Sequence, residues 1–410
     1  MERIVVVGMS LAGLRACESL RLAGYTGTIT AIGAERHLPY DRPPLSKMLL
    51  KGDWEPERIQ LRKPEEFASL DLDLRLGVRA TSLDAANRAV TLASGDVVAG
   101  DGVIIATGTE PRLLPNQPEL DGIVTLRTLD DSLDLRRRLV EAADVVVIGA
   151  GFIGLEVAAT AAGHGCHVEV IEAARAPLMR GLGAEMGEVV ARVHGRNGVR
   201  IRCDTRLDAI VGAGGQVTGV QLSDGEVVRG DVVVVGIGVA PATAWLEGSG
   251  LELRDGVVCS QHLRAAEGVY AAGDAVRWPN ALFGEAGEEM RIEHWTNAAE
   301  QGAVAAENLL TELGGAAPTP YSPVPFFWSD QFDSRIQFVG RAHGDDDVRV
   351  VTGDLDGKFV ALYGHQGRLR GVLGVGLPRL VMPYRKLLAE RVSWDDALGL
   401  AANAQAKAER

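Results

Sequence analysis

The sequence predicts an α/β fold, with two Rossmann-like dinucleotide-binding domains followed by a C-terminal α+β domain. Two glycine-rich turns, each placed between a short apolar strand and a helical segment, predict the two nucleotide domains. Near the C-terminal end, four segments with the alternation of antiparallel strands are followed by helical sequence, which predicts the α+β domain. The length of 410 residues accommodates two to three domains of about 150 residues each.

The strongest motif lies in the middle of the chain. An apolar strand runs into Gly149, Gly151 and Gly154 at the spacing G-x-G-x-x-G, and a helical segment then leads to a second strand that ends at Glu172. The first glycine allows a tight turn, the second lets the backbone approach a pyrophosphate, and the third lets the helix pack close to the sheet. Glu172 is placed to accept hydrogen bonds from an adenosine ribose. Because all these parts occur in order, the motif predicts a dinucleotide site rather than an ordinary glycine-rich loop.

A weaker copy of the same unit begins the chain. Gly8, Ser10 and Gly13 occupy its glycine positions, and Glu35 stands near the end of its second strand. Because Ser10 replaces the middle glycine, close approach of the backbone must tolerate a small side chain. Taken alone, this copy is equally consistent with an ordinary strand–helix junction. Two such units in one chain predict two bound nucleotides, and the economical pairing is a flavin with a nicotinamide.

Three further strands end in turns of small residues that let the backbone lie against a cofactor. The turns are at Ala106, Thr107 and Gly108, at 236–238, and at Gly273 and Asp274. Asp274 is either a plain turn residue or a carboxylate suited to a ribityl hydroxyl. The pattern of apolar residues predicts helices over 11–23 and 184–193, and a third helix that follows the segment 290–302 and runs to about 313. Residues 314–325 are predicted to be a linker. Strands are predicted at 4–7, 28–32, 199–201, 209–211, 217–222, 232–236, 335–340, 348–352, 359–363 and 367–375.

Composition narrows the possible functions. The formal charge of −13 argues against a general nucleic-acid binder. The first strand begins almost at once in M-E-R-I-V-V-V-G, which leaves no room for a signal peptide. No apolar stretch approaches the roughly 20 residues of a membrane-spanning helix. We therefore expect a soluble, cytoplasmic protein with no membrane or nucleic-acid partner.

The four cysteines do not form a recognisable pattern. They include no C-x-x-C and no close pair, so neither a disulfide framework nor a metal site is expected. The segment 37–47 has no cysteine and contains three prolines, which exclude a regular helix or central strand. A rigid surface loop is the alternative interpretation of this segment.

The assembled motifs resemble those of the flavoprotein ferredoxin reductases that serve bacterial oxygenases, such as putidaredoxin reductase and the biphenyl dioxygenase ferredoxin reductases. The resemblance rests on P-Y-D-R-P-P-L-S-K, A-T-G-T-E-P-R, L-R-T-L, G-A-G-F-I-G-L-E, A-A-G-D, E-H-W-T-N-A-A-E-Q-G and F-W-S-D-Q, which span the chain in order. It implies a glutathione-reductase-like fold. The implied domains are an FAD domain of 1–112 and 245–320, an NAD domain of 113–244, and a C-terminal α+β domain of 321–410.

The resemblance also implies site residues. Those implied for FAD are Gly8, Ser10, Ala12, Gly13, Glu35, Arg42, Lys47, Ala80, Ala106, Thr107, Gly108, Arg127, Gly273, Asp274, Glu293 and Trp295. Those implied for NAD are Gly149, Gly151, Ile153, Gly154, Glu156, Glu172 and Gly236. Lys47 and Glu156 would be catalytic, with Lys47 near the hydride-accepting nitrogen and Glu156 paired with it across the domain junction. A helix opening near Thr296 would aim its positive end at the flavin, and Trp295 would either cover the ring or pack at the domain junction.

The implied function is an NADH-dependent ferredoxin reductase. It would take a hydride from NADH, preferred over NADPH, onto FAD, and pass single electrons to an iron–sulfur ferredoxin, expected to carry two irons and two sulfurs. That ferredoxin would serve a cytochrome P450 or a Rieske oxygenase. A basic patch at Arg341, Arg379, Arg385 and Lys386 is a candidate for docking, against the alternative of a solvated helix face. A disulfide reductase of the implied architecture needs a cysteine pair beside the flavin, and a peroxidase needs one cysteine there, whereas the corresponding loop, 37–47, has none. An NADH oxidase or peroxidase-type flavoenzyme and a non-catalytic FAD/NADH redox sensor remain the alternative functions.

Overall fold

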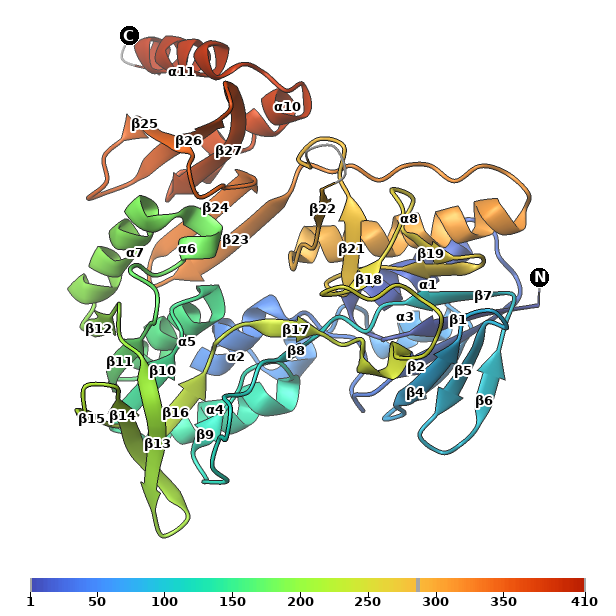
Figure 1. Cartoon of the computed structure of the whole chain (residues 1–410), viewed down its shortest axis with the longest axis horizontal. Helices are drawn as coiled ribbons and strands as arrows, with labels where there is room; N and C mark the ends of the chain where they lie inside the picture. Colours follow the sequence, from blue (N-terminus) through green and yellow to red (C-terminus); the bar gives the residue numbers. More distant parts are fainter. Residues whose placement is uncertain (1, 285–287, 409–410) are drawn as a thin grey trace. The chain divides into compact units, whose positions relative to one another are not determined.

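The computed structural model of this protein describes residues 2–284 and 288–408 (Figure 1). The chain forms two compact units, each assembled from separate segments. Unit 1 consists of Met1–Asp41, Ile59–Glu110 and Ala240–Pro325, and unit 2 of Arg42–Arg58, Pro111–Val239 and Phe326–Arg410. The chain passes between the units at five points: after Asp41, after Arg58, within β8 (Thr109–Pro111), within β17 (Val239–Pro241) and after Pro325. The expected division into three domains at other boundaries stays a prediction.

Unit 1 is built on a six-stranded sheet of order β19-β20-β7-β1-β2-β3. Neighbouring strands from β20 to β3 run parallel, and only β19 pairs antiparallel. Apolar runs such as Ile4–Val7 are buried, as expected of a sheet covered on both faces. The strands are β1 (Arg3–Val7), β2 (Thr28–Gly33), β3 (Leu72–Leu76), β7 (Gly102–Ile105), β19 (Arg264–Ala266) and β20 (Val269–Ala271).

Two long helices of unit 1 pack against each other, α1 (Leu11–Leu22) and α8 (Trp295–Leu313) (Figure 1). Gly302 makes this close packing possible, because a Cβ there would lie 2.2 Å from the Ala12 carbonyl oxygen. Both helices match the sequence prediction. Smaller elements complete the unit: α3 (Pro64–Ala68), the sheet of β4 (Ala80–Asp84), β5 (Ala89–Leu92) and β6 (Val97–Ala99), and the sheet of β18 (Val257–Val258), β21 (Val276–Pro279) and β22 (Glu289–Met290).

Unit 2 contains a second parallel sheet of order β12-β11-β10-β16-β9. Its central strand is almost entirely valine and isoleucine, which suits a strand buried on both faces. The strands are β9 (Ile123–Val124), β10 (Asp144–Ile148), β11 (His167–Ile171), β12 (Val199–Arg202) and β16 (Val232–Val235). The associated helices are α4 (Leu129–Glu141), α5 (Phe152–Gly163), α6 (Met179–Leu182) and α7 (Ala184–Arg196), and a separate sheet contains β13 (Leu207–Ala213), β14 (Gln216–Leu222) and β15 (Val227–Arg229).

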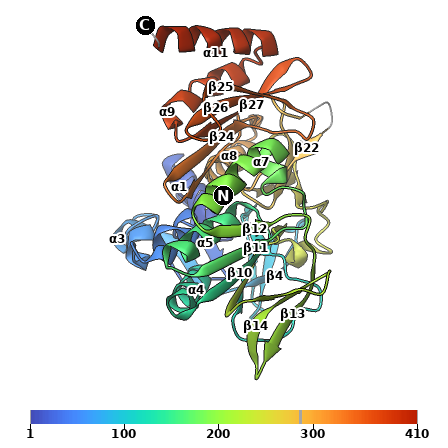
Figure 2. The same ribbon diagram turned by 90° about the vertical axis from the view of Figure 1, so that its left-hand side faces the viewer.

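The C-terminal part of unit 2 is an antiparallel sheet of order β23-β24-β27-β26-β25. Its strands are β23 (Phe326–Gln331), β24 (Ser334–Gly340), β25 (Asp347–Gly353), β26 (Phe359–His365) and β27 (Arg368–Val375). The helices α9 (Pro378–Val381), α10 (Tyr384–Ala389) and α11 (Trp394–Ala408) pack against it (Figure 1 and Figure 2). Four of these strands were predicted from alternation. β23 was not, because it lies in the motif F-W-S-D-Q, where aromatic and polar residues obscure the period.

The Pro-rich loop departs from regular structure, as its prolines require. Pro43–Ser46 forms a single turn of 3-10 helix, with proline at its start, and the short helix α2 (Met48–Lys51) follows. This segment belongs to unit 2, where Ser132 Oγ donates to the Leu45 carbonyl at 2.7 Å and Thr160 Oγ1 donates to the Ser46 carbonyl at 2.9 Å. No helix in the described part of the chain combines the length and apolarity that crossing a membrane requires.

Candidate functional site

The first glycine-rich turn closes against another predicted cofactor turn within unit 1. Gly8 has a φ of +106°, and a Cβ there would lie 2.2 Å from the Ala106 carbonyl oxygen. Gly13 packs against the same turn, because its Cβ would meet the Gly8 carbonyl oxygen at 1.8 Å. Ser10 immediately precedes α1, whose first amides face away from the helix body. The fold therefore requires glycine at the two outer positions of the turn that begins α1, whereas the middle position is occupied by Ser10.

Other predicted residues of unit 1 gather around this turn. A Cβ on Gly273 would lie 3.1 Å from Ala12 Cβ, and the Gly273 amide donates to Gln301 Oε1 at 2.8 Å. Thr109 Oγ1 lies 3.4 Å from a carboxylate oxygen of Asp274. The structure thus brings the turn at 273–274 next to the start of α1.

Glu35 and Ala80 lie near the carboxyl end of β2. The Glu35 carboxylate accepts a hydrogen bond from the hydroxyl of Tyr40. Ala80 is buried at the start of β4, two residues after Val78, whose amide donates to the Gly33 carbonyl at 2.9 Å. In a parallel sheet, ligands bind outside the carboxyl ends of the strands. Both residues therefore occupy the ligand-binding edge of this sheet.

Trp295 is the first residue of α8, one position before the expected start. Its indole Nε1 donates to Asp41 Oδ1 at 2.6 Å, which fixes the ring. Glu293, two residues earlier, is ion-paired with Arg291 at 2.6 Å. The helix has 19 residues, and its positive N-terminal end lies in this segment.

The second glycine-rich turn has the same construction in unit 2. Gly149 has a φ of +99°, and a Cβ there would lie 2.4 Å from the Gly236 carbonyl oxygen. A Cβ on Gly154 would meet the Gly149 carbonyl oxygen at 2.3 Å. Gly151 differs from both, since a Cβ there would have no neighbour within 4 Å. The outer glycines are required by the fold, whereas the middle glycine faces open space at the start of α5.

Glu172 is held in a fixed position at the end of β11. Its two carboxylate oxygens accept hydrogen bonds from the amides of Ala150 and Ala174, each at 2.7 Å. A carboxylate oxygen has a second lone pair, so each can accept a further bond from a ribose hydroxyl. Ile153, in the first turn of α5, leaves 42% of its surface exposed, which makes it available for an apolar contact.

Lys47 and Glu156 form a buried ion pair within unit 2. Lys47 Nζ lies 2.7 Å from Glu156 Oε2, and the two side chains are 11% and 5% exposed. The hydroxyls of Ser46 and Ser329 also donate to the Glu156 carboxylate, at 2.5 and 2.6 Å. The carboxylate is therefore satisfied by one cation and two hydroxyls, as a buried charge must be. Because the Lys47 side chain is largely buried, it is not a solvated surface charge.

The predicted flavin residues are divided between the units. Arg42, Lys47 and Arg127 belong to unit 2, and the others belong to unit 1. Within unit 2, Arg42 Nη1 donates to the Arg127 carbonyl at 2.5 Å, and the Arg127 amide donates to Asp131 Oδ2 at 3.0 Å. The Lys47–Glu156 pair, expected across a domain junction, lies inside one unit. The roles of all these residues stay predictions.

Several residues that hold the site together were not singled out from the sequence. Ser46 and Ser329 bind the Glu156 carboxylate, Gln301 binds the Gly273 amide, and Tyr40 binds Glu35. Each stands inside a motif on which the family resemblance rests, and this was the only available signal. Their partners lie up to 173 residues away, so no local spacing indicates the contact.

Comparison with known proteins places the chain in a family. Residues 2–302 match the family described as pyridine nucleotide-disulphide oxidoreductase, and residues 326–407 match the reductase C-terminal family. This chain belongs to the pyridine nucleotide-disulphide oxidoreductases. The oxidoreductase match covers the parallel sheets of both units, and the reductase C-terminal match covers the antiparallel sheet of unit 2.

Proteins of similar sequence or structure match this chain along nearly its whole length. Rhodocoxin reductase of Rhodococcus erythropolis is 38% identical over 94% of this chain and 89% of its own length. The ferredoxin–NAD(+) reductase component of the anthranilate 1,2-dioxygenase system of Burkholderia cepacia is 37% identical over 95% and 94%. The crystal structure of the covalent putidaredoxin reductase–putidaredoxin complex matches with a TM-score of 0.90 at 31% identity, covering 97% of this chain and 95% of that chain. The family resemblance and the fold class predicted from the sequence are confirmed.

The two nucleotides that this oxidoreductase family uses, FAD and NAD(H), fit the two turns. Open space at Gly151 admits a pyrophosphate next to the first amides of α5, and Glu172 offers acceptor oxygens at the end of the neighbouring strand. In unit 1, Ser10 holds the equivalent position before α1, and Glu35 stands just beyond the end of β2. These arrangements are the ones that a phosphate and a ribose require.

Replacing Gly151 with alanine tests the nicotinamide site. We expect little change in stability, because the backbone there has a φ of −77° and the added methyl group meets no neighbour. We expect NADH binding to weaken about tenfold, because the methyl group occupies space that the pyrophosphate approaches. Titration of flavin absorbance with NADH and urea unfolding measure the two effects. Gly163→Ala, at the far end of the same helix and equally unobstructed, is the control and leaves both unchanged.

Proposed function

We propose that this enzyme is an NADH-dependent ferredoxin reductase of an oxygenase system. Unit 2 binds NADH at the Gly149–Gly154 turn, and unit 1 binds FAD at the Gly8–Gly13 turn. The bound flavin supplies the redox chemistry, because it accepts a hydride from NADH and releases electrons one at a time. The acceptor is an iron–sulfur ferredoxin of the two-iron, two-sulfur class, and we place the reaction in the cytoplasm, where NADH is available.

The environment of the four cysteines supports a ferredoxin, rather than a disulfide or a peroxide, as the electron acceptor. Burial raises the pKa of all four thiols, that of Cys17 to about 12. None of them lies in the segment 37–47 or forms a disulfide. Because the thiolate is the reactive form, these thiols are poorly suited to pass electrons to a disulfide or to attack a peroxide. Electrons must therefore leave from the flavin directly, which suits a one-electron protein acceptor.

The chain's own residues contribute position and charge to the reaction. Glu156, held by the two serines, fixes the Lys47 ammonium in place at the end of the 3-10 turn of the Pro-rich segment. A cation held rigidly lowers the cost of forming negative charge next to it, since no reorganisation is needed during the reaction. We assign Lys47 to stabilising the reduced flavin and Glu156 to orienting Lys47.

Steady-state turnover with NADH separates the possible functions. With a two-iron, two-sulfur ferredoxin and excess NADH, we expect sustained reduction of the ferredoxin and of ferricyanide. A redox sensor would reduce its flavin once and stop. Turnover with hydrogen peroxide, oxygen or a disulfide in the absence of any ferredoxin reduction would refute the proposal.

We propose that the ferredoxin binds a basic surface on α9 and α10. Arg379 and Lys386 are exposed there, and Leu380 and Met382 between them leave 45% and 41% of their surface exposed. Lys386 lies 3.6 Å from Glu390, but an exposed pair of this kind is weak and leaves the cation available. Arg385 and Arg341 are half-buried and are the less accessible members of the predicted patch. Exposed apolar residues flanked by cations are suited to an acidic partner.

Salt dependence tests this α9–α10 surface. Because the whole chain has a formal charge of −13, a local basic surface must attract an acidic ferredoxin. Ferredoxin reduction should therefore weaken as salt rises past about 0.1 M, where the screening length is about 10 Å. Reduction of a small neutral quinone should respond much less. The variant Arg379→Glu/Lys386→Glu should lose most ferredoxin turnover, whereas Arg137→Glu, an exposed arginine on α4, should retain it. Full turnover in the double variant would rule out this surface.

A further inference from the structure

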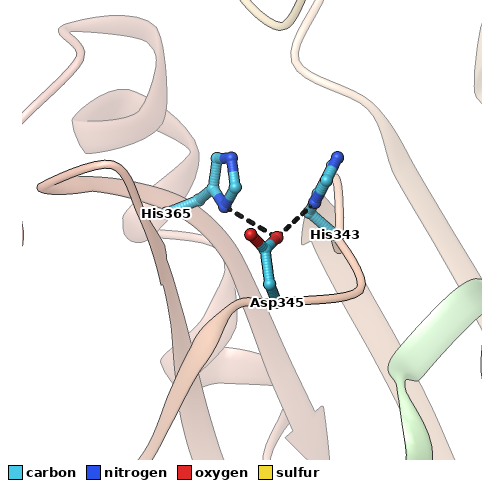
Figure 3. Close-up of side chains that lie close together, drawn as sticks. All are labelled: His343, Asp345 and His365. Carbon is cyan, nitrogen blue, oxygen red and sulfur yellow. Dashed lines mark hydrogen bonds and ion pairs between the residues drawn. The ribbon is translucent and has the colours of Figure 1, made fainter.

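Four titratable side chains meet at one end of the antiparallel sheet in unit 2. His343, Asp345 and Asp346 stand in the turn between β24 and β25, and His365 is the last residue of β26. Figure 3 shows both imidazole rings directed at the Asp345 carboxylate. The Asp345 Oδ1 atom lies 2.5 Å from His343 Nδ1 and 3.2 Å from His365 Nδ1. A turn and a strand end that are separate in sequence thus contribute to one cluster, which neither nucleotide site uses.

Asp346 provides a second and independent observation. Its side chain is only 1% exposed, and its Oδ1 atom has no hydrogen-bond partner. This oxygen lies 3.5 Å from His365 Nδ1 and is therefore next to the cluster. Its other oxygen, Oδ2, accepts a hydrogen bond from the His343 amide at 2.5 Å, which fixes the direction of the carboxyl group. A buried carboxylate oxygen without a donor is uncommon, and it is an available ligand for a cation.

The spacing of these atoms suits a metal ion. The possible ligand atoms of His343, Asp345 and His365 lie within 4.8 Å of one another. A tetrahedral ion bound at 2.0–2.2 Å holds its ligand atoms about 3.3 Å apart. The separations of 3.2 Å and 3.5 Å from His365 Nδ1 to the two carboxylates are close to this value. The His343 and Asp345 side chains are 58% and 74% exposed, so small movements can bring their ligand atoms to the distances that a bound ion requires.

The donor atoms decide which class of ion would bind. Two imidazole nitrogens with carboxylate oxygens suit zinc and neighbouring first-row metals, whereas magnesium and calcium prefer oxygen ligands alone. We propose that His343, His365, Asp345 and Asp346 form a zinc-type divalent metal site in the C-terminal part of the chain. The sequence predicted no metal site, because that expectation rested on the cysteines and the ligands here come from two segments that are separate in sequence.

The position of the site indicates a structural role. A metal bound there links the turn before β25 to the end of β26, strands that already pair at Asp347 and Gly364. It closes the open end of this hairpin without touching either glycine-rich turn. The proposal is therefore independent of the proposed reductase function, and basal turnover from NADH to ferricyanide does not need the metal.

Zinc titration of the untagged, FAD-loaded enzyme tests this proposal. After treatment with a chelator, calorimetric titration with zinc chloride should show one ion bound per chain, and zinc should raise the thermal unfolding temperature. His343→Ala and Asp346→Asn should each weaken binding at least tenfold, which is the loss expected even for outer partners of a metal. His167→Ala, an exposed histidine of β11, is the matched control and should bind zinc like the wild type.

Two results would overturn the metal site. One is a wild-type titration without a stoichiometric binding event. The other is equal zinc affinity in the wild type and in His343→Ala/His365→Ala, which would place any binding elsewhere. Circular dichroism and flavin content establish that each variant is folded, and ferricyanide turnover at the wild-type rate shows that the nucleotide sites are intact. Loss of ferredoxin turnover with zinc binding intact would bear on the proposed function alone.

Discussion

Lys47→Ala should slow the reduction of the flavin by NADH about a hundredfold, the loss typical of removing one fixed charge or donor from a reaction centre. Affinity for NADH should change less than about threefold, because the cation acts on charge that appears as the flavin is reduced. Stopped-flow absorbance over a range of NADH concentrations gives the limiting rate and the dissociation constant separately. Lys51→Ala is the control, since Lys51 is 58% exposed and ion-paired with Asp53.

The same substitution also affects stability, and the two effects must be separated. Removing Lys47 leaves the Glu156 carboxylate buried without its cation, which typically costs about 3–5 kcal/mol. In Lys47→Ala/Glu156→Gln the carboxylate is gone; one of the two hydroxyls of Ser46 and Ser329 can donate to the amide oxygen, and the other can accept from the amide NH2 group. We expect this double variant to recover most of the free energy of unfolding but not the rate of flavin reduction. Recovery of both would make Lys47 a structural residue, and an unchanged rate in Lys47→Ala would remove it from the mechanism.

The parts of the fold that the sequence predicted are those with a local cause. β10, β11 and the turn between them follow from a valine run, three glycines at fixed spacing and a second apolar strand. Gly149 needs a positive φ that other residues rarely adopt, so its identity indicates its geometry directly. By contrast, α4 was missed although Thr128 and Asp131 cap its start reciprocally and its leucines form one buried face, because most of its other residues are charged.

The parts that could not be predicted depend on contacts between distant segments. The Glu156 carboxylate receives its bonds from residues 110 and 173 positions away. The Pro-rich segment packs in unit 2 through Ser132 and Thr160, and neither residue carries a signal of this contact in its own neighbourhood. The cluster at His343 and His365 is similar, because strand pairing in the folded sheet brings together two segments that have no motif in common.

The preference for NADH over NADPH should depend on Glu172. The carboxylate is fixed by the amides of Ala150 and Ala174, so it cannot easily turn away from a 2′-phosphate on the adenosine ribose. Repulsion between these like charges should cost a few kcal/mol, which corresponds to about a hundredfold preference in kcat/KM. Arg175 and Arg180 are exposed nearby in sequence and reduce this preference rather than reverse it.

Glu172→Gln isolates the charge from the shape of the site. Glutamine retains one oxygen to accept from an amide but has no negative charge, so discrimination against NADPH should fall to about tenfold or less. Most of this change should come from better use of NADPH, because the ribose of NADH still finds a polar partner. Glu169→Gln is the matched control, since this acid of the same strand is paired with Arg202 at 2.7 Å and should leave the preference intact. A wild-type enzyme with equal or higher kcat/KM for NADPH would contradict the role of Glu172, because a fixed carboxylate at the ribose cannot favour an added phosphate.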